Sequence, residues 1–144
     1  QIGLRATGYA ADDFNWGRDK GWTVVQAEEC WHKSLTPLMQ IVRDRIGDAP
    51  VYFTYDIDSL DSAFAPGTGT VEPGGLTTWQ GLEIIRGAAG LNLVGCDLVE
   101  VSPPYDPTGL CCTNRVRDSS RESNVVAAGH EQTHAPRLQD PELA

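Results

Sequence analysis

The sequence predicts an α/β fold, in which helices pack on a parallel β-sheet. Three short segments, 22–27, 51–57 and 91–101, are rich in β-branched and aromatic residues, as strands are. Two other segments, 36–46 and 77–89, carry apolar residues at helical spacing. Strand and helix signals that alternate in this way predict βαβ units, whose consecutive strands run parallel.

The chain begins with what the pattern predicts to be the end of a strand, Gln1–Arg5, because this segment starts apolar. The following segment, Gly8–Gly21, is polar with scattered aromatic residues and predicts a loop or a loosely helical connection. Trp22–Ala27 is short and β-rich, which indicates a buried strand.

The first clear helix begins near Thr36, whose hydroxyl can cap it. Pro37 suits the first turn, where its missing N–H is not needed, and Gly47 ends the helix. Its apolar face is predicted to hold Leu38, Val42 and Ile46.

A second strand, Val51–Ile57, is followed by a segment rich in Gly and Pro, Asp58–Gly75. Thr77 then opens a helix, and Gln80 three residues later completes a capping-box pattern. The apolar stripe of this helix is predicted to comprise Leu82, Ile85 and Ala89. The third strand, Leu91–Val101, completes a strand–helix–strand unit.

The length and the net charge of the chain limit the functions that it can have. The 144 residues suffice for one ordinary domain, and 11 Lys and Arg against 20 Asp and Glu give a net charge of −9. Binding to nucleic acid or to an anionic membrane needs a basic patch, so we expect neither as a partner. An acidic surface is compatible with a small cationic substrate. No apolar run approaches the length of a membrane span.

The cysteines and the isolated histidine do not indicate a zinc site or a fold held together by disulfides. Cys30, Cys96, Cys111 and Cys112 form no C-x-x-C pair. We therefore expect free thiols in a reducing compartment, the cytoplasm or alternatively the mitochondrion, and no secretory signal is visible at the start. His32 is most simply a surface or half-buried histidine.

The most informative local feature is a pair of carboxylates, Asp56 and Asp58, at the end of the second strand. Alternation places both on one side, with Ile57 packed on the other. Ligands of open parallel sheets bind at this carboxyl edge, and two adjacent carboxylates favour Mg²⁺, Mn²⁺ or Ca²⁺ between them. Alternatively, one Asp caps the turn while the other is solvated. Glu100 ends the third strand at the same edge, either as a loop anchor or as a partner for a cationic group of the substrate.

The final segment, 113–144, contains no aromatic residue, Ile or Met, which predicts a disordered tail. Within it, His130 to His134 matches the zinc motif H-E-x-x-H. Gly129 precedes the motif and Pro136 follows it closely, so we interpret the match as coincidental.

A longer stretch carries a family resemblance. Thr54–Thr77, which reads TYDIDSLDSAFAPGTGTVEPGGLT, resembles the manganese signature of the arginase/agmatinase (ureohydrolase) family. Val94–Asp106, VGCDLVEVSPPYD, is similar to a later segment of the agmatinase and guanidinobutyrase branch, which residues 1–5 and 24–33 also fit. The resemblance covers residues 1–109.

The resemblance implies a three-layer α/β/α domain (the arginase-like fold) with a binuclear Mn²⁺ site at the carboxyl edge of its parallel sheet. Hydroxide bridging the metals attacks the carbon of a guanidino compound, such as agmatine or 4-guanidinobutanoate, and releases urea and an amine. By position in the motif, Asp56 would bridge both ions, Asp58 would ligate the second, and Glu100 would hold the guanidinium. Family members are usually homo-oligomers.

The departures from the family are equally specific. The earlier Gly-x-His and Asp-x-His-x-Asp motifs, and with them a general acid/base histidine, are not in this sequence; Ser62 and Val71 replace prolines. We therefore interpret residues 1–112 as the C-terminal half of a ureohydrolase domain, and 113–144 as an unrelated tail. Alone it should be a poor catalyst. The alternative is a non-catalytic fragment, or a regulatory partner of a full-length ureohydrolase.

Overall fold

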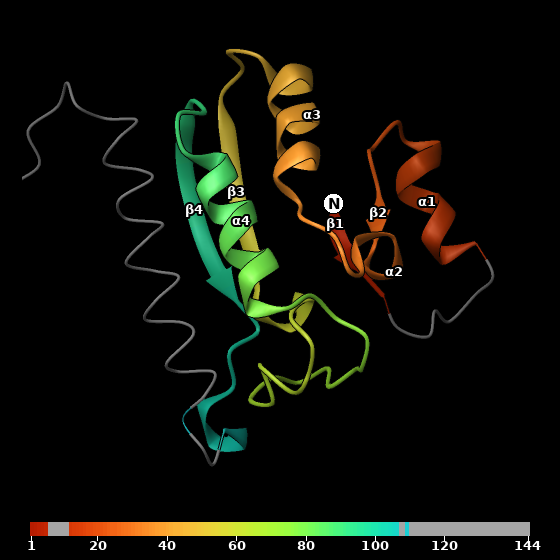
Figure 1. Ribbon diagram of the computed structural model, residues 1–144, viewed down its shortest axis with the longest axis vertical. Helices are drawn as coiled ribbons and strands as arrows, with labels where there is room; N and C mark the ends of the chain where they lie inside the picture. Colours follow the sequence, from red (N-terminus) through yellow and green to blue (C-terminus); the bar gives the residue numbers. More distant parts are fainter. Residues whose placement is uncertain (6–11, 107–108, 110–144) are drawn as a thin grey trace, which may run out of the picture.

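The computed structural model describes residues 1–5, 12–106 and 109 (Figure 1). The predictions for the tail, 113–144, and for its H-E-x-x-H match therefore lie outside the described residues, as do those for Cys111 and Cys112. No helix in the described part of the chain is long and apolar enough to cross a membrane.

The amino-terminal unit consists of a strand β1 (Ile2–Leu4), a helix α1 (Asp13–Asp19) and a strand β2 (Val25–Gln26). The two strands are parallel, and the backbone N–H of Val25 donates to the carbonyl of Gln1. The strand predicted at 22–27 is shorter than expected. Trp22 is exposed, and the chain turns into a short helix α2 (Ala27–Cys30), because Gln26 and Glu29 form a capping box there.

Helix α3 (Thr36–Ile46) confirms the predicted helix but not its predicted cap. Leu35, not Thr36, occupies the capping position, where its N–H donates to a carboxylate oxygen of Glu83 at 2.8 Å. The Ser34 hydroxyl accepts from the backbone N–H of Thr36. The start of α3 is therefore held by a neighbouring side chain, Ser34, and by a side chain from a distant helix, Glu83, in place of the predicted Thr36 cap. Gly47 ends the helix as predicted, with a φ of 58°.

The carboxyl-terminal unit consists of β3 (Val51–Asp56), α4 (Thr78–Ala88) and β4 (Leu93–Val99). β3 and β4 pair in parallel along their length, which confirms the predicted βαβ arrangement. The capping box between Thr77 and Gln80 is present as predicted. α4 lies against this pair of strands (Figure 1).

The described strands form two separate two-stranded sheets, β1 with β2 and β3 with β4. The parallel pairing within each sheet agrees with the prediction, but no backbone ladder joins the two sheets. Figure 1 shows β1 and β2 standing apart from β3 and β4.

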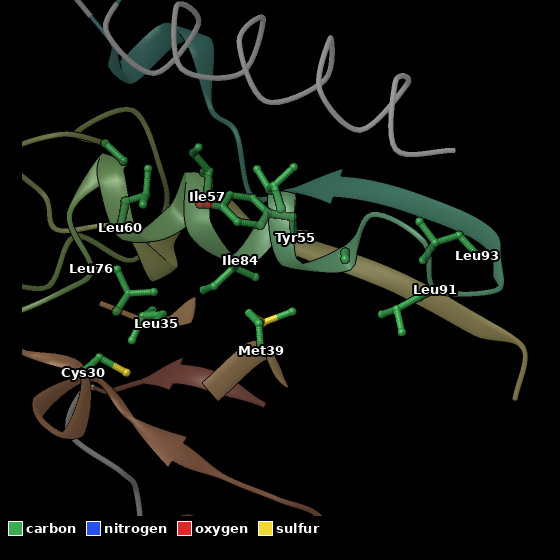
Figure 2. Close-up of a cluster of buried hydrophobic side chains, with 13 residues drawn as sticks. Cys30, Leu35, Met39, Tyr55, Ile57, Leu60, Leu76, Ile84, Leu91 and Leu93 are labelled. Carbon is green, nitrogen blue, oxygen red and sulfur yellow. The ribbon is translucent and has the colours of Figure 1, made fainter. Parts of the chain in front are cut away.

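The buried apolar cluster lies where α4 meets α3 and the segment after β3 (Figure 2). Ile57, Leu60 and Leu76 at its centre are at most 1% exposed. Full burial of side chains of this size contributes about 1.5–3 kcal/mol each. On α3, Met39 is buried, and the predicted face of Leu38, Val42 and Ile46 is partly buried against the same cluster.

Candidate metal centre at the carboxyl edge of the strands

The two predicted carboxylates follow directly from the way β3 ends. Asp56 is its last residue, and the chain then enters a 3-10 turn η1 (Ile57–Ser59). The backbone N–H of Asp58 donates to Oδ1 of Asp56 at 3.1 Å, which starts the turn one residue earlier than predicted. Ile57 is fully buried in the core. Asp56 therefore caps the turn, as one of the two interpretations expected, and it also lies beside Asp58. Metal binding by the pair, the other interpretation, stays a prediction.

The electrostatics of the pair show that the carboxylates are close. Burial raises the pKa of Asp58, and the neighbouring charge of Asp56 and its hydrogen bond raise it further, to about 6; Glu100 adds a smaller repulsion, while Arg5 opposes the shift. Two acidic neighbours, Asp56 and Glu100, therefore act on Asp58 at this edge. A cation placed between two such carboxylates would relieve their repulsion.

Glu100 reaches the edge from the neighbouring strand. Asp56 is paired in register with Val99, the last residue of β4, so Glu100 lies one residue beyond that pair. Its backbone adopts a left-handed conformation with a φ of 61°, which costs a residue with a side chain about 1–3 kcal/mol. The side chain is exposed. The residue predicted to contact the substrate therefore lies in a left-handed turn, with its side chain exposed.

Arg5 is a site residue that the sequence interpretation missed. It follows β1, and its guanidinium donates to the backbone carbonyls of Asp58 at 2.6 Å, Glu72 at 2.7 Å and Leu60 at 3.1 Å. The same group stabilises the ionised form of Asp58. A cation directly after an apolar strand, at the edge where the acids gather, is a signal that could have identified it.

The loop between β3 and α4 is also held from within by the carboxylate of Asp61. It accepts from the backbone N–H groups of Gly74 at 2.7 Å, Ala63 at 2.9 Å and Gly75 at 3.1 Å. These hydrogen bonds hold the pKa of Asp61 below its ordinary value. A Cβ at position 75 would lie 2.4 Å from the backbone nitrogen of Asp61, so only glycine fits there. The loop that follows the acidic pair therefore has one fixed path.

The segment after Glu100 is docked on this same loop. The backbone N–H of Ser102 donates to the carbonyl of Gly67 at 2.7 Å, and a Cβ at Gly67 would lie 2.5 Å from Cβ of Asp106. The chain approaches so closely that position 67 must be glycine. This contact holds the segment that carries Glu100 against the loop that follows Asp58.

The carboxylates at this edge could supply part of the ligands of a metal site. Asp56 and Asp58 offer oxygen ligands of the kind that hard divalent ions prefer. Among the residues that the structure describes, however, no group of three His, Cys, Asp or Glu side chains could hold an ion. His32 is exposed, which agrees with one of its two predicted alternatives, and neither Cys30 nor Cys96 takes part in a disulfide within the described residues.

Several known proteins are similar to this chain in sequence and in fold. Residues 1–123 match the family model described as "Arginase family". The chain is 70% identical over 109 residues to a guanidinobutyrase of Pseudomonas aeruginosa, a match that covers 76% of this chain and 34% of that relative. It is 58% identical over 109 residues to the human mitochondrial guanidino acid hydrolase, covering 76% of this chain and 31% of that protein. The chain thus spans about a third of the length of these curated relatives.

Solved structures give the same result at the level of the fold. The proclavaminate amidino hydrolase of Streptomyces clavuligerus superimposes with a TM-score of 0.83 at 36% identity, covering 90% of this chain and 43% of that chain. The arginase of Bacillus caldovelox, at 23% identity and a TM-score of 0.75, shares the fold. The predicted arginase-like fold is therefore confirmed.

Proposed function

The chain belongs to the arginase family, and from that premise we propose that its acidic edge is part of a Mn²⁺-dependent site that hydrolyses a guanidino compound to urea and an amine. One observation carries the proposal: Asp56 and Asp58 lie side by side at the carboxyl edge of two parallel strands, where the Asp58 N–H donates to the Asp56 carboxylate, and Glu100 lies one residue beyond the end of the neighbouring strand. The names of the relatives, guanidinobutyrase and guanidino acid hydrolase, support a substrate of the agmatine or 4-guanidinobutanoate type.

In this proposal Asp56 and Asp58 would hold manganese. When bound, such ions supply Lewis acidity and lower the pKa of a water so that it can attack at neutral pH. The chain's own contribution is to bring the two carboxylates together and to hold Asp58 by its backbone. Arg5 does this through the Asp58 carbonyl, and Asp56 through the Asp58 N–H.

Glu100 would hold the guanidinium of the substrate. A carboxylate can accept two parallel N–H bonds from a planar guanidinium, which fixes the orientation of the group as well as its position. The exposed carboxylate of Glu100, on a left-handed turn beside the acidic pair, is accessible to a cation that approaches this edge. The net charge of −9 favours the approach of such a cation.

A second candidate follows from the partial donor set. The described residues do not supply a group of three metal ligands, and the chain spans about a third of its relatives. We therefore also consider a non-catalytic piece or regulatory partner of a full-length ureohydrolase. In both cases residues 1–112 would be the C-terminal half of a ureohydrolase domain, with 113–144 as a separate tail, and the whole protein would be an oligomer.

Two measurements test the proposal. The first is Mn²⁺ binding to the isolated chain by calorimetry, with Asp58→Ala expected to abolish the binding and Asp44→Ala, on the outer face of α3, expected to leave it unchanged. The second is a chimera, in which residues 1–109 replace the matched 109 residues of the Pseudomonas guanidinobutyrase. We expect the chimera to release urea from 4-guanidinobutanoate or agmatine in the presence of Mn²⁺.

Variants of the chimera separate the roles. Asp58→Ala should lower urea release by at least a thousandfold, because it removes a metal ligand. Glu100→Gln should act mainly through substrate recognition, about a hundredfold in kcat/KM, since a charged hydrogen-bonded pair contributes about 1.5–3 kcal/mol. A chimera that folds and binds Mn²⁺ but releases no urea would refute the catalytic proposal and favour the non-catalytic candidate.

A further inference from the structure

Glu100 is held in a left-handed backbone conformation, with a φ of 61°. Among the described residues, His32 is the other one that adopts a positive φ without being glycine. A side chain makes this conformation unfavourable, because its Cβ comes too close to the carbonyl oxygen that follows. Such strained residues persist only where the surrounding structure over-determines them, and they cluster at functional sites. The contacts on either side of Glu100 must therefore maintain its conformation.

The chain is fixed immediately before and after Glu100. Before it, Val99 is the last residue of β4 and is paired with the last residue of β3. After it, Val101 packs against the buried apolar cluster, and the backbone N–H of Ser102 donates to the carbonyl of Gly67 at 2.7 Å. The left-handed conformation of Glu100 thus occurs in a short span between two fixed ends.

The end of this span that lies on the loop is itself firmly held. A Cβ at position 67 would lie 2.5 Å from the Cβ of Asp106, so the two backbones approach each other closely. Asp106, Thr68 and Ala65 are all buried. Packed groups of this kind cannot shift without disturbing their neighbours. The hydrogen bond from Ser102 to Gly67 and the close approach of Gly67 to Asp106 are together called the Gly67 contact.

The base of the same loop is held at the acidic pair. Arg5 donates to carbonyls on both arms of the loop, those of Asp58 and Leu60 on the outgoing arm and those of Glu72 and Pro73 on the returning arm. One loop therefore begins at the acidic pair and contacts the segment after β4. The loop sets where that segment lies relative to the pair.

We propose that Gly67 and Ser102 are positioning residues, which act through the Gly67 contact to hold Glu100 in its left-handed turn and so place its carboxylate for the guanidinium of a substrate. This inference rests on the proposed function, in which Glu100 binds that group. A binding group on a fixed backbone loses less conformational freedom when the ligand arrives. Displacing the contact should therefore weaken substrate recognition. Asp56 and Asp58 should keep their metal affinity, since the hydrogen bond between them does not involve the contact.

The first measurement is a cycle of variants in the full 144-residue chain without metal. Glycine adopts a left-handed backbone freely, so Glu100→Gly relieves the strain. We expect this variant to lower the unfolding equilibrium constant about fivefold in the unsubstituted chain, at the low end of the usual cost of such strain. In Gly67→Ala the added Cβ displaces Asp106 and lets Glu100 relax, so Glu100→Gly should give no such gain in that background.

The second measurement separates substrate recognition from metal binding, in the same chimera with the Pseudomonas guanidinobutyrase. We expect Gly67→Ala to lower kcat/KM for urea release by at least about tenfold and to change the Mn²⁺ affinity, measured by calorimetry, by less than about twofold. A merely structural role would lower both quantities. Gly69→Ala is the matched control and should change neither, since a Cβ there meets nothing within 4 Å.

The proposal is overturned if Glu100→Gly gives the same gain in both backgrounds, if kcat/KM is unchanged in Gly67→Ala, or if the Mn²⁺ affinity falls together with kcat/KM. Should circular dichroism show that Gly67→Ala is unfolded, the amide of Ser102 in the unsubstituted chain decides. Slow hydrogen exchange there supports the contact, and exchange at the rate of an unfolded peptide overturns it. An inactive unsubstituted chimera would refute the hydrolytic proposal, whereas the cycle of variants, which needs neither metal nor substrate, would still decide whether the Gly67 contact holds Glu100.

Discussion

The two βαβ units of this chain differ in how much of their own surface they bury. In the carboxyl-terminal unit, β3 and β4 are six and seven residues long, and α4 buries five residues. In the amino-terminal unit, β1 and β2 have three and two residues. Of this unit, Ile2 and Val25 pack against the buried cluster, and both are only partly buried. Trp16 and Trp22 contact each other edge to face but remain largely exposed.

The difference shows what a βαβ unit needs in order to be stable. The carboxyl-terminal unit brings a capped helix with a continuous apolar face, so its strands are covered as soon as they pair. The amino-terminal unit has a short helix without a side-chain cap and depends on contacts from elsewhere in the chain. Arg5 provides several of these contacts, through hydrogen bonds to carbonyls of the segment after β3. Small units of this kind are stable only when neighbours cover them.

The largest expected effect is in the core of the carboxyl-terminal unit. Ile85→Ala should lower the free energy of unfolding by about 4 kcal/mol, since deletion of a buried aliphatic side chain removes its burial energy and leaves a cavity. Ile85 is 1% exposed. Urea unfolding followed by tryptophan fluorescence measures the loss. Ile41→Ala, on the exposed face of α3, should cost under about 0.5 kcal/mol; an equal loss in both variants would contradict the burial assignment.

Arg5→Ala should separate the two units. It removes hydrogen bonds from a charged donor to carbonyls of the segment that follows β3, which should cost about 2–3 kcal/mol. Amide exchange should speed up in β1 and β2 while β3 and β4 stay protected. Arg18→Ala removes an exposed ion pair with Glu29 at 3.7 Å and should cost at most about 1 kcal/mol. Uniform loss of protection in all four strands would argue against independent units.

Gly75→Ala should disturb the loop of the carboxyl-terminal unit by about 2 kcal/mol, because the added Cβ would meet backbone atoms of Leu60 and Asp61 that cannot move aside. Gly69→Ala is the matched control, since a Cβ there meets nothing within 4 Å. Thermal unfolding compares the two. Similar melting temperatures for the two variants would show that the loop has more than one path.

The smallest expected effect is electrostatic. The hydrogen bonds that hold the pKa of Asp61 below its ordinary value of 3.8 contribute stability that is complete above that value and is lost as the pH falls through the lower folded pKa. Asp61→Asn should therefore cost about 1 kcal/mol at pH 7, an amount limited by solvent screening, and less at low pH. Urea unfolding from pH 2 to 7 measures the profile.

Asp58→Asn should behave in the opposite way. The pKa of Asp58 is raised to about 6, so in metal-free protein its ionised form opposes folding, and stability falls as the pH rises toward 6. Replacing it with Asn should raise stability at pH 7 and have little effect below pH 4. A loss of stability at pH 7 in the metal-free variant would show that the carboxylates do not repel each other.

The features of the fold that depend on residues close together in the sequence could be predicted. The capping box of Thr77 and Gln80 spans three residues, and the left-handed Gly47 ends its helix directly, so both appear as predicted. The position of Asp56 and Asp58 at the carboxyl edge of the sheet could also be predicted. Strand alternation sets which side a residue faces, and parallel strands have their carboxyl ends at the same edge. Their roles as metal ligands stay predictions.

The rest depended on contacts between distant positions. Glu83 caps the start of α3 from 48 residues away, and Arg5 holds a loop more than 50 residues away. No spacing rule reveals such pairs, since they form only when packing brings their elements together. The sequence by itself thus determined the main strands and helices, the cap of α4 and the acidic edge, through hydrogen bonds and burial patterns within a few residues. Only the tertiary structure decided that the described strands divide into two sheets, because the pairing of a strand edge depends on which backbones the whole chain can bring alongside it.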